Sequence, residues 1–422
     1  MNRKQMDIVK YLFLLIPFFK PVGLATISGF NSIMQLWKVV SIVLLLLFYF
    51  PRSNNQRLFK NNKGIIGFII FGIVYVVNCV RFGNDYSNIL NNFITDCVLM
   101  YLIISTSVSR KKKINAFMSA LCYLFIFWII VQSLSIFAVR AGFLHLSDGS
   151  SGDYCYIFGT DNYSAFAMIP MIVVSCYIMR LKNSKRNYIT KSIILCALVT
   201  VGYVYVRSIS AAVACLLLLV FQVFSGKWKK LLKHITVKKT LLFLAIILFL
   251  IIRYDIQNYF SHFIAEVLGK GDKATTLNSR TIIWSMAIDL IKSKPILGYG
   301  AFSQEMIDNY ILYGIDHTHN LLLELMVRTG IVGTMAYFYF LLVPLTKNYK
   351  KLLRSKSNIL VCGMIIVLVL SFMDIYPLMQ YQYVLFAFLY CWENMEKAYS
   401  DGECGDLYYE ENRCGSLKLQ EL

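Results

Sequence analysis

Apolar residues in this chain come in long runs that recur from one end to the other, with short polar segments between them. A helix needs about 20 predominantly apolar residues to cross the hydrocarbon core of a bilayer. The pattern therefore predicts an all-α integral membrane protein with about twelve membrane-spanning helices. The predicted spans are residues 7–20, 33–50, 64–80, 91–108, 114–138, 162–180, 190–206, 208–225, 239–253, 321–346, 357–373 and 376–394.

Basic clusters without acidic residues occur at alternate connections between these spans. Five segments carry lysine and arginine but no aspartate or glutamate: 51–63, 110–113, 180–191, 227–239 and 347–356. With twelve spans, all five lie on the same side as both termini. Basic loops mark the cytoplasmic side of a membrane protein. Both termini are therefore predicted to be cytoplasmic, and the remaining loops extracytoplasmic.

Composition agrees with this interpretation. Of the 422 residues, 58% are hydrophobic and only 15% are charged, and the formal net charge is +19. A basic soluble protein of this kind would suggest nucleic acid as a partner. Here the charge lies in loops between apolar segments, so it indicates membrane orientation, and no nucleic-acid partner is expected.

One loop is much longer than a connector requires, and such loops are usually functional. It divides the chain into an N-terminal bundle (1–253), an extracytoplasmic loop (254–320), three further spans (321–394) and a cytoplasmic tail (395–422). The halves of the chain do not mirror each other, which argues against a transporter built from repeats.

The loop is expected to contain two short amphipathic helices. Asn278 or Ser279 can cap a helix that begins near Arg280, and Pro295 with the turn at 298–300 would end it. A second helix is expected over residues 301–313. Helices of this kind can lie on the outer membrane surface and enclose a cavity.

The densest polar cluster, Asp316-His317-Thr318-His319-Asn320, stands where the loop meets the tenth span. In the simplest interpretation Asn320 caps the incoming helix and the histidines are incidental. Asp316 and the histidines could instead hold a metal, which we rank lowest because no other His or Cys cluster supports it. In the third interpretation one histidine removes a proton from an acceptor hydroxyl.

Charged residues near the loop admit similar alternatives. Glu324 and Arg328, at i and i+4 of the tenth span, form either a packing ion pair or part of a functional site. Arg207, Arg253 and Arg280 are predicted at the outer surface. Arginines there suit a phosphate or pyrophosphate, although many such residues only meet lipid headgroups.

Order and spacing of one set of residues resemble the signature loop of the O-antigen polymerase and ligase superfamily. The set comprises Asn278-Ser279-Arg280, Trp284, Ala287, Lys294-Pro295-Ile296-Leu297-Gly298-Tyr299-Gly300, His319-Asn320-Leu321-Leu322-Leu323-Glu324 and Thr329-Gly330-Ile331-Val332-Gly333. The resemblance covers about 60 residues, and the rest of the chain agrees in its number of spans and topology.

The resemblance implies a membrane-embedded glycosyltransferase that needs neither metal nor cofactor. Its donor would be a polyprenyl-pyrophosphate-linked oligosaccharide outside the bacterial cytoplasmic membrane. Carried over to this sequence, Arg280 would bind the pyrophosphate and His319 would activate the acceptor hydroxyl, with His317 as the second choice of base. The family's second arginine follows a serine, whereas Arg207 precedes Ser208.

Three functions follow from these observations. The leading prediction is a polymerase that joins the repeat units of a surface polysaccharide such as an O-antigen, capsule or exopolysaccharide. It is favoured by residues 17–21, which resemble a segment of capsule and exopolysaccharide polymerases. The first alternative is a ligase of the same superfamily, and the alternative from another class is a flippase for lipid-linked glycans. Membrane lipid, a chain-length regulator and a flippase of the same pathway are the expected partners.

Overall fold

The structure of the protein is a computed structural model. The residues it describes are 2–27, 29–49, 62–84, 86–140, 142–145, 154–182, 185–224, 234–254, 271–302, 317–346, 349–372 and 379–417. Almost all of them are helical. Within the described ranges, two short strands, β1 (Leu144–His145) and β2 (Tyr154–Cys155), pair in antiparallel fashion.

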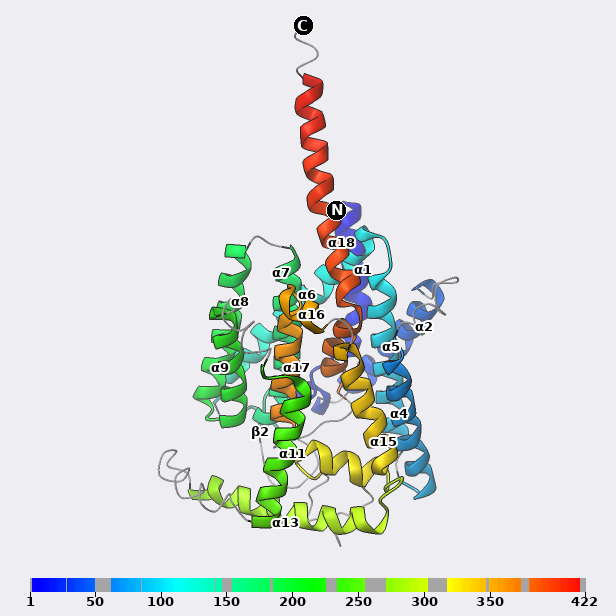
Figure 1. Cartoon of the computed structure of the whole chain (residues 1–422), viewed down its shortest axis with the longest axis vertical. Helices are drawn as coiled ribbons and strands as arrows, with labels where there is room; N and C mark the ends of the chain where they lie inside the picture. Colours follow the sequence, from blue (N-terminus) through cyan, green and yellow to red (C-terminus); the bar gives the residue numbers. More distant parts are fainter. Residues whose placement is uncertain are drawn as a thin grey trace.

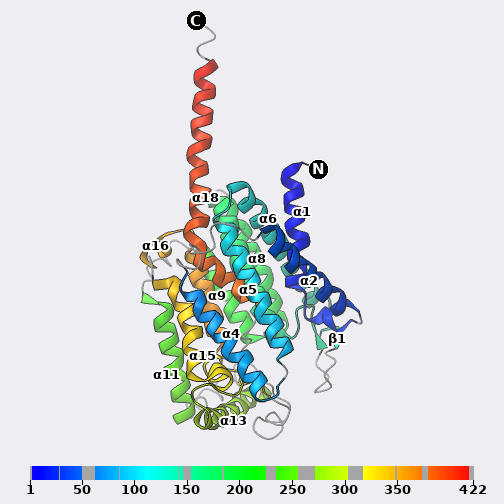
Figure 2. The same ribbon diagram turned by 90° about the vertical axis from the view of Figure 1, so that its right-hand side faces the viewer.

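Long helices run roughly side by side in a bundle (Figures 1 and 2). Their bounds are α1 Arg3–Leu15, α2 Phe30–Tyr49, α4 Gly64–Arg81, α5 Ser87–Ser107, α6 Lys111–Ala138, α7 Asp161–Lys182, α8 Lys185–Tyr205, α9 Ile209–Val223, α11 Val237–Tyr254, α13 Gly271–Ser293, α15 Leu321–Thr346, α16 Tyr349–Arg354, α17 Asn358–Leu370 and α18 Gln380–Leu417. Short 3₁₀ turns, η1 (Ile16–Phe19) and η2 (Gly23–Thr26), separate α1 from α2.

Helix α7 forms the centre of the bundle. It is apolar on all sides, and its residues 164–181 are all buried. A helix that is hydrophobic around its whole circumference belongs in the interior of a protein. Helices α6, α8, α9, α17 and α18 pack around it. By contrast, α2 buries only 22% of its apolar window, which is the pattern of a helix that faces lipid.

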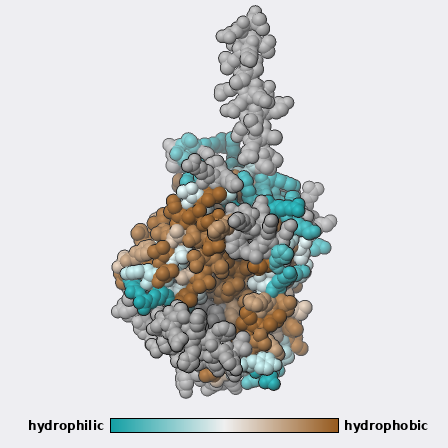
Figure 3. All heavy atoms as spheres, turned by 60° about the vertical axis from the view of Figure 1, so that its left-hand side comes forward, coloured by the Kyte–Doolittle hydropathy of each residue, from teal (hydrophilic) through white to brown (hydrophobic). Residues whose placement is uncertain are grey.

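The bundle is that of a membrane protein. Among the described residues, seven helices are long and apolar enough to cross a bilayer, and Ile209–Val223 and Asn358–Leu370 are shorter apolar helices. Figure 3 shows a band of hydrophobic residues across one face, with hydrophilic residues toward both ends. Each of the twelve predicted spans overlaps a helix. The count of twelve spans and the side of the membrane on which each loop lies stay predictions.

The tenth predicted span is not one continuous helix. Gly330 has φ 58° and ψ −165°, and α15 is kinked there. Residues 321–329 lie across the lower end of the bundle in Figure 1, close to α13, and the part after Gly330 rises beside α4. The predicted span over 321–346 is therefore present as two helical parts joined at Gly330, because glycine readily adopts a positive φ that a helix does not permit.

The loop before this span differs from its prediction in a second way. Helix α13 begins at Gly271 rather than near Arg280, although it ends at Ser293, as expected from Pro295. Asn278 and Ser279 therefore lie inside the helix instead of capping it, since such residues are only mildly unfavourable in a helix interior. Most of the second predicted helix, at 301–313, lies outside the described residues, as does Asp316.

Candidate functional site

The kink in α15 is held by the loop that follows α13. In a continuous helix the N–H groups of Ile331 and Val332 would bond the carbonyls of Val327 and Arg328. Here those N–H groups donate to the carbonyls of Pro295 (2.9 Å) and Ile296 (3.2 Å) instead. The two freed carbonyls accept from the N–H groups of Tyr299 and Gly300, each at 2.8 Å. All four groups at the break are thus satisfied by one loop, residues 294–301.

Glycines allow this loop and the kink to approach each other closely. A Cβ on Gly330 would lie 2.3 Å from the carbonyl carbon of Ile296, and one on Gly298 would lie 2.5 Å from the carbonyl oxygen of Val327. Both glycines also have positive φ. Gly330 therefore admits the backbone of this loop. Gly333 faces Thr329 of its own helix, since a Cβ on Gly333 would lie 2.3 Å from the Cβ of Thr329.

The C-terminal end of α4 fixes the same loop from the other side. Asn78 donates its side-chain amide to the carbonyl of Leu297 and, at 3.3 Å, to that of Arg328. Asn84 donates to the carbonyl of Ala301 (2.5 Å), and the Ala301 N–H donates to the sulfur of Cys79 (3.1 Å). Loop, kink and α4 therefore form one hydrogen-bonded unit.

Segment 317–320 alternates anchored and accessible residues. Thr318 is fully buried and Asn320 is 2% exposed, whereas His317 and His319 are half-buried. Asn320 caps α15, as the simplest interpretation expected, since its side-chain oxygen accepts from the N–H groups of Leu322 (3.1 Å) and Leu323 (3.2 Å). The two imidazole rings lie 4.0 Å apart between centroids. The same segment thus caps α15 through Asn320 and leaves the two histidine side chains partly accessible.

Backbone strain marks two of the candidate residues. Within the described ranges, the non-glycine residues with positive φ are Arg207 (φ 59°) and His319 (φ 53°). A residue other than glycine costs on the order of 1–3 kcal/mol in such a conformation, and strained residues of this kind cluster at functional sites. The anchors on both sides of His319 supply the contacts that keep it there.

Glu324 connects the histidine segment to α4. Its carboxylate is fully buried and accepts the N–H of Thr318 (2.7 Å) and Nε of Arg328 (2.5 Å). Arg328, whose side chain is 14% exposed, also donates to the hydroxyl of Tyr75 and lies over the ring of Phe302. The predicted i, i+4 pair is therefore present, and it lies before the kink rather than within the straight span.

Arg280 stands on a helix that contacts this segment directly. One turn after it, the Trp284 indole N–H donates to the carbonyl of Thr318 (2.9 Å). Trp284 is fully buried in a small apolar core formed by α11, α13 and the first part of α15. Since residues i and i+4 share a helix face, half-buried Arg280 lies on the side of α13 that meets the histidine segment.

The other two arginines occupy different positions. Arg253 is exposed on the last turn of α11, a helix that contributes Leu248 and Ile251 to the same apolar core. Arg207 is exposed at the turn between α8 and α9, where Ser208 and Ser210 bond the side chain of Asn162. This hairpin packs on α7 and α17. The structure thus brings Arg253, Arg280 and the histidine segment around one core and places Arg207 on another part of the bundle.

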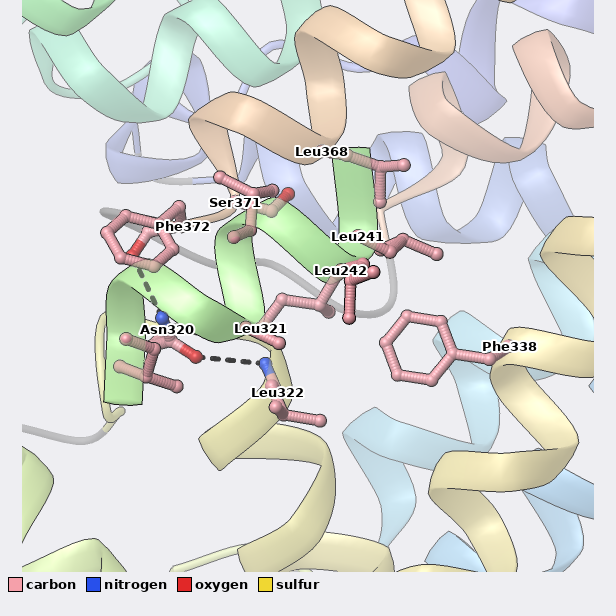
Figure 4. Close-up of a pocket in the computed structure, with 12 residues that line it drawn as sticks. Leu241, Leu242, Asn320, Leu321, Leu322, Phe338, Leu368, Ser371 and Phe372 are labelled. Atoms are coloured by element: carbon pink, nitrogen blue, oxygen red, sulfur yellow. Dashed lines mark hydrogen bonds between the residues drawn. The ribbon is translucent and has the colours of Figure 1, made fainter. Parts of the chain in front are cut away.

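An apolar cavity of about 300 Å³ lies between α11, α15 and α17. Its walls are leucines, phenylalanines and Ala245, and its polar members are Asn320 and Ser371. Figure 4 shows Asn320 at one side of this cavity, with its amide donating to the carbonyl of Phe372 (3.1 Å). The cavity therefore ends beside the residue that follows His319.

Sequence reasoning missed several parts of this arrangement. Tyr75, Asn78 and Asn84 fall in or just after a predicted apolar span, where the pattern assigns them no role, and Trp284 enters the sequence argument only as a motif residue. Polar side chains inside or beside a predicted span were the available signal for the first three, because such groups need partners in a membrane.

Comparison with protein families gives a match between residues 154–338 and the family model described as O-Antigen ligase. No curated protein matches the chain. The matched region begins at β2, includes α7 to α13 and the histidine segment, and ends within α15. A glycosyltransferase-like membrane enzyme related to surface polysaccharides is what this family indicates. The resemblance in the signature residues is thereby confirmed, because residues 154–338, which contain them, match the O-antigen ligase family.

Proposed function

We propose that the protein is a repeat-unit polymerase for a surface polysaccharide. It would transfer a glycan from a polyprenyl-pyrophosphate donor to a sugar hydroxyl of a second lipid-linked unit, at the extracytoplasmic face of the bacterial cytoplasmic membrane. The apolar cavity that ends at Asn320 carries this proposal. A leucine-lined space suits a hydrocarbon chain, and one of its two polar lining residues, Asn320, directly follows His319.

The donor's charged group would then lie between the cavity and α13. Arg280 is assigned to the pyrophosphate because its helix face contacts the histidine segment through Trp284. Arg253 approaches from α11 and is a second candidate, and Arg207 is a third. A guanidinium group suits this task because its planar donors match phosphate oxygens.

His319 is assigned as the base. In the proposed reaction its imidazole takes the proton of the acceptor hydroxyl as that oxygen attacks the anomeric carbon. The bond from that carbon to the pyrophosphate oxygen breaks, and the arginines stabilise the charge that develops on the leaving group. Direct displacement inverts the anomeric carbon and requires no metal. His317 stays the alternative base, since its ring lies beside that of His319.

A ligase of the same superfamily fits the family match equally well, because only the acceptor differs. The polymerase is preferred for the early segment at 17–21, part of which is structured as η1. A flippase is the alternative from another class. It requires polar residues spread along a translocation path, whereas Arg253, Arg280 and the histidine segment lie around one small apolar core.

The test uses the full-length protein in lipid nanodiscs with a synthetic lipid-linked repeat unit. Wild type should give a ladder of products on a gel, and His319→Ala should slow product formation about 10²- to 10⁴-fold, the usual contribution of a general base. His234→Ala, at an exposed position in the segment before α11, is the matched control and should be unaffected. Full activity of His319→Ala contradicts the assignment, and attachment only to a different acceptor indicates a ligase.

A further inference from the structure

Two cationic side chains from different helices meet at one aromatic ring on the outer end of the molecule. Arg81 ends α4 and Lys294 directly follows α13. The Lys294 ammonium lies 3.7 Å from the centroid of Phe82, and the Arg81 guanidinium carbon lies 5.4 Å from it. The two charges are therefore separated by at most about 9 Å, roughly one Debye length at physiological ionic strength.

Neither cation is neutralised within the described part of the chain. No hydrogen bond or ion pair is formed there by the Lys294 ammonium or the Arg81 guanidinium, although both lie on aromatic faces. Partial burial lowers the pKa of Lys294 from its ordinary value, and the charge of Arg81 lowers it further. A cation favours a helix C-terminus, but this does not explain why two cations converge against their mutual repulsion. An anion between them would.

The surroundings of these cations are rigid. The Lys294 ammonium also lies 4.2 Å from the centroid of Tyr299, whose hydroxyl bonds Ser293 (2.5 Å). The backbone of Tyr299 is held by the α15 kink. Stacking on aromatic rings orders the long side chains while their N–H groups stay available. Such pre-organisation reduces the entropy lost when a ligand binds.

Position identifies the ligand. Lys294 lies about 21 Å from Arg280 along the axis of α13, at 1.5 Å per residue. Figure 1 shows α13 lying across the lower end of the bundle, perpendicular to most helices, so the two ends of this helix stand at a similar level. In a polymerase the acceptor attacks with the end of its glycan that is farther from the lipid. Its own pyrophosphate must therefore lie away from the reacting atoms, by the length of the repeat unit.

We propose that Arg81 and Lys294, with Phe82 and Tyr299 beneath them, form a second phosphate-binding site that holds the pyrophosphate of the lipid-linked acceptor. This proposal rests on the polymerase function proposed above. A site of this kind would bind any phosphate anchored in the membrane, so an ordinary anionic phospholipid is the competing ligand. The two sources differ in one respect: only the acceptor links this site to glycan transfer.

The experiment separates donor from acceptor by chemistry. The donor analogue has its own attacking hydroxyl blocked, so that it cannot serve as an acceptor. In the acceptor analogue a carbon replaces the oxygen between the sugar and the first phosphorus, which gives a phosphonate that cannot serve as a donor. Arg81→Ala/Lys294→Ala in the full-length protein should raise the acceptor KM at least about tenfold, the effect of losing one or more charge-assisted contacts. The donor KM should not change. Lys292→Ala, which removes a 70% exposed charge of the same helix, is the matched control.

Two further arms assign the ligand. Wild type should prefer the pyrophosphate acceptor to one with an uncharged lipid anchor, and the double variant should not distinguish them. Equal use of both by wild type, or a defect that depends only on phosphatidylglycerol in the nanodisc, overturns the proposal. Direct binding of the fluorescent acceptor analogue covers the case in which wild type transfers nothing. In that case the polymerase function fails, whereas equal affinity of wild type and double variant overturns the second site.

Discussion

Replacing Glu324 tests whether this buried carboxylate positions the histidine segment. Its two oxygens bridge the Thr318 N–H at 2.7 Å and the Arg328 guanidinium at 2.5 Å. Glu324→Ala leaves Arg328 with an uncompensated charge in a site where its side chain is 14% exposed. Breaking a buried ion pair in this way costs about 3–5 kcal/mol. An unsatisfied N–H at Thr318 adds about 1–3 kcal/mol.

Stability and rate should then respond differently to a second change. Replacing both partners of a buried pair by apolar residues of similar volume is often neutral. Glu324→Leu/Arg328→Met should therefore recover most of the stability that Glu324→Ala loses. It should not recover the rate, because Thr318 still lacks its acceptor and His319 is no longer held. Displacement of a reacting group by about 1 Å can cost 10²-fold in rate.

Two measurements check this prediction. Thermal unfolding of the protein in detergent gives the stability of wild type, Glu324→Ala and the double variant. Initial rates of glycan transfer at saturating substrate give kcat for the same three proteins. Equal stability of the single and double variants would show that the unpaired Arg328 charge does not cause the loss of stability in Glu324→Ala. Full kcat in the double variant would refute the positioning role of Glu324.

Three further changes test other parts of the site. Gly330→Ala should destabilise the protein by more than the 1–3 kcal/mol of a strained backbone alone, because its Cβ meets loop backbone; Gly83→Ala, also at positive φ but in open space, is the control in the same unfolding assay. Trp284→Phe keeps the ring but loses the bond to Thr318, worth about 1 kcal/mol, and should lower kcat several-fold; an unchanged kcat contradicts this. Ala245→Trp fills the apolar cavity and should raise the KM for long polyprenyl donors more than for short ones; equal effects would exclude the cavity as the tail site.

Much of the bundle could be predicted from the sequence, because the positions of membrane helices depend mainly on local hydrophobicity. A bilayer requires long apolar helices, so runs such as 114–138 and 162–180 could be located within a few residues. Relations between distant segments could not be found in this way. The contact of Trp284 with Thr318 and the bond of Asn78 to the carbonyl of Arg328 join residues of unrelated local pattern.

The kink at Gly330 shows why local pattern fails at the site itself. Residues 321–346 have the length and apolar content of one span, and glycine is tolerated in membrane helices. What breaks the helix is a loop more than 25 residues earlier, which offers two acceptors and two donors to the interrupted turn. The two parts of the signature, 294–300 and 317–333, thus contact each other through these backbone hydrogen bonds. The loop that carries Tyr299 is bonded to the carbonyls of Val327 and Arg328, and the Arg328 side chain pairs with Glu324, which holds Thr318 beside the proposed base. The Glu324 carboxylate therefore connects the proposed second phosphate site to the histidine segment.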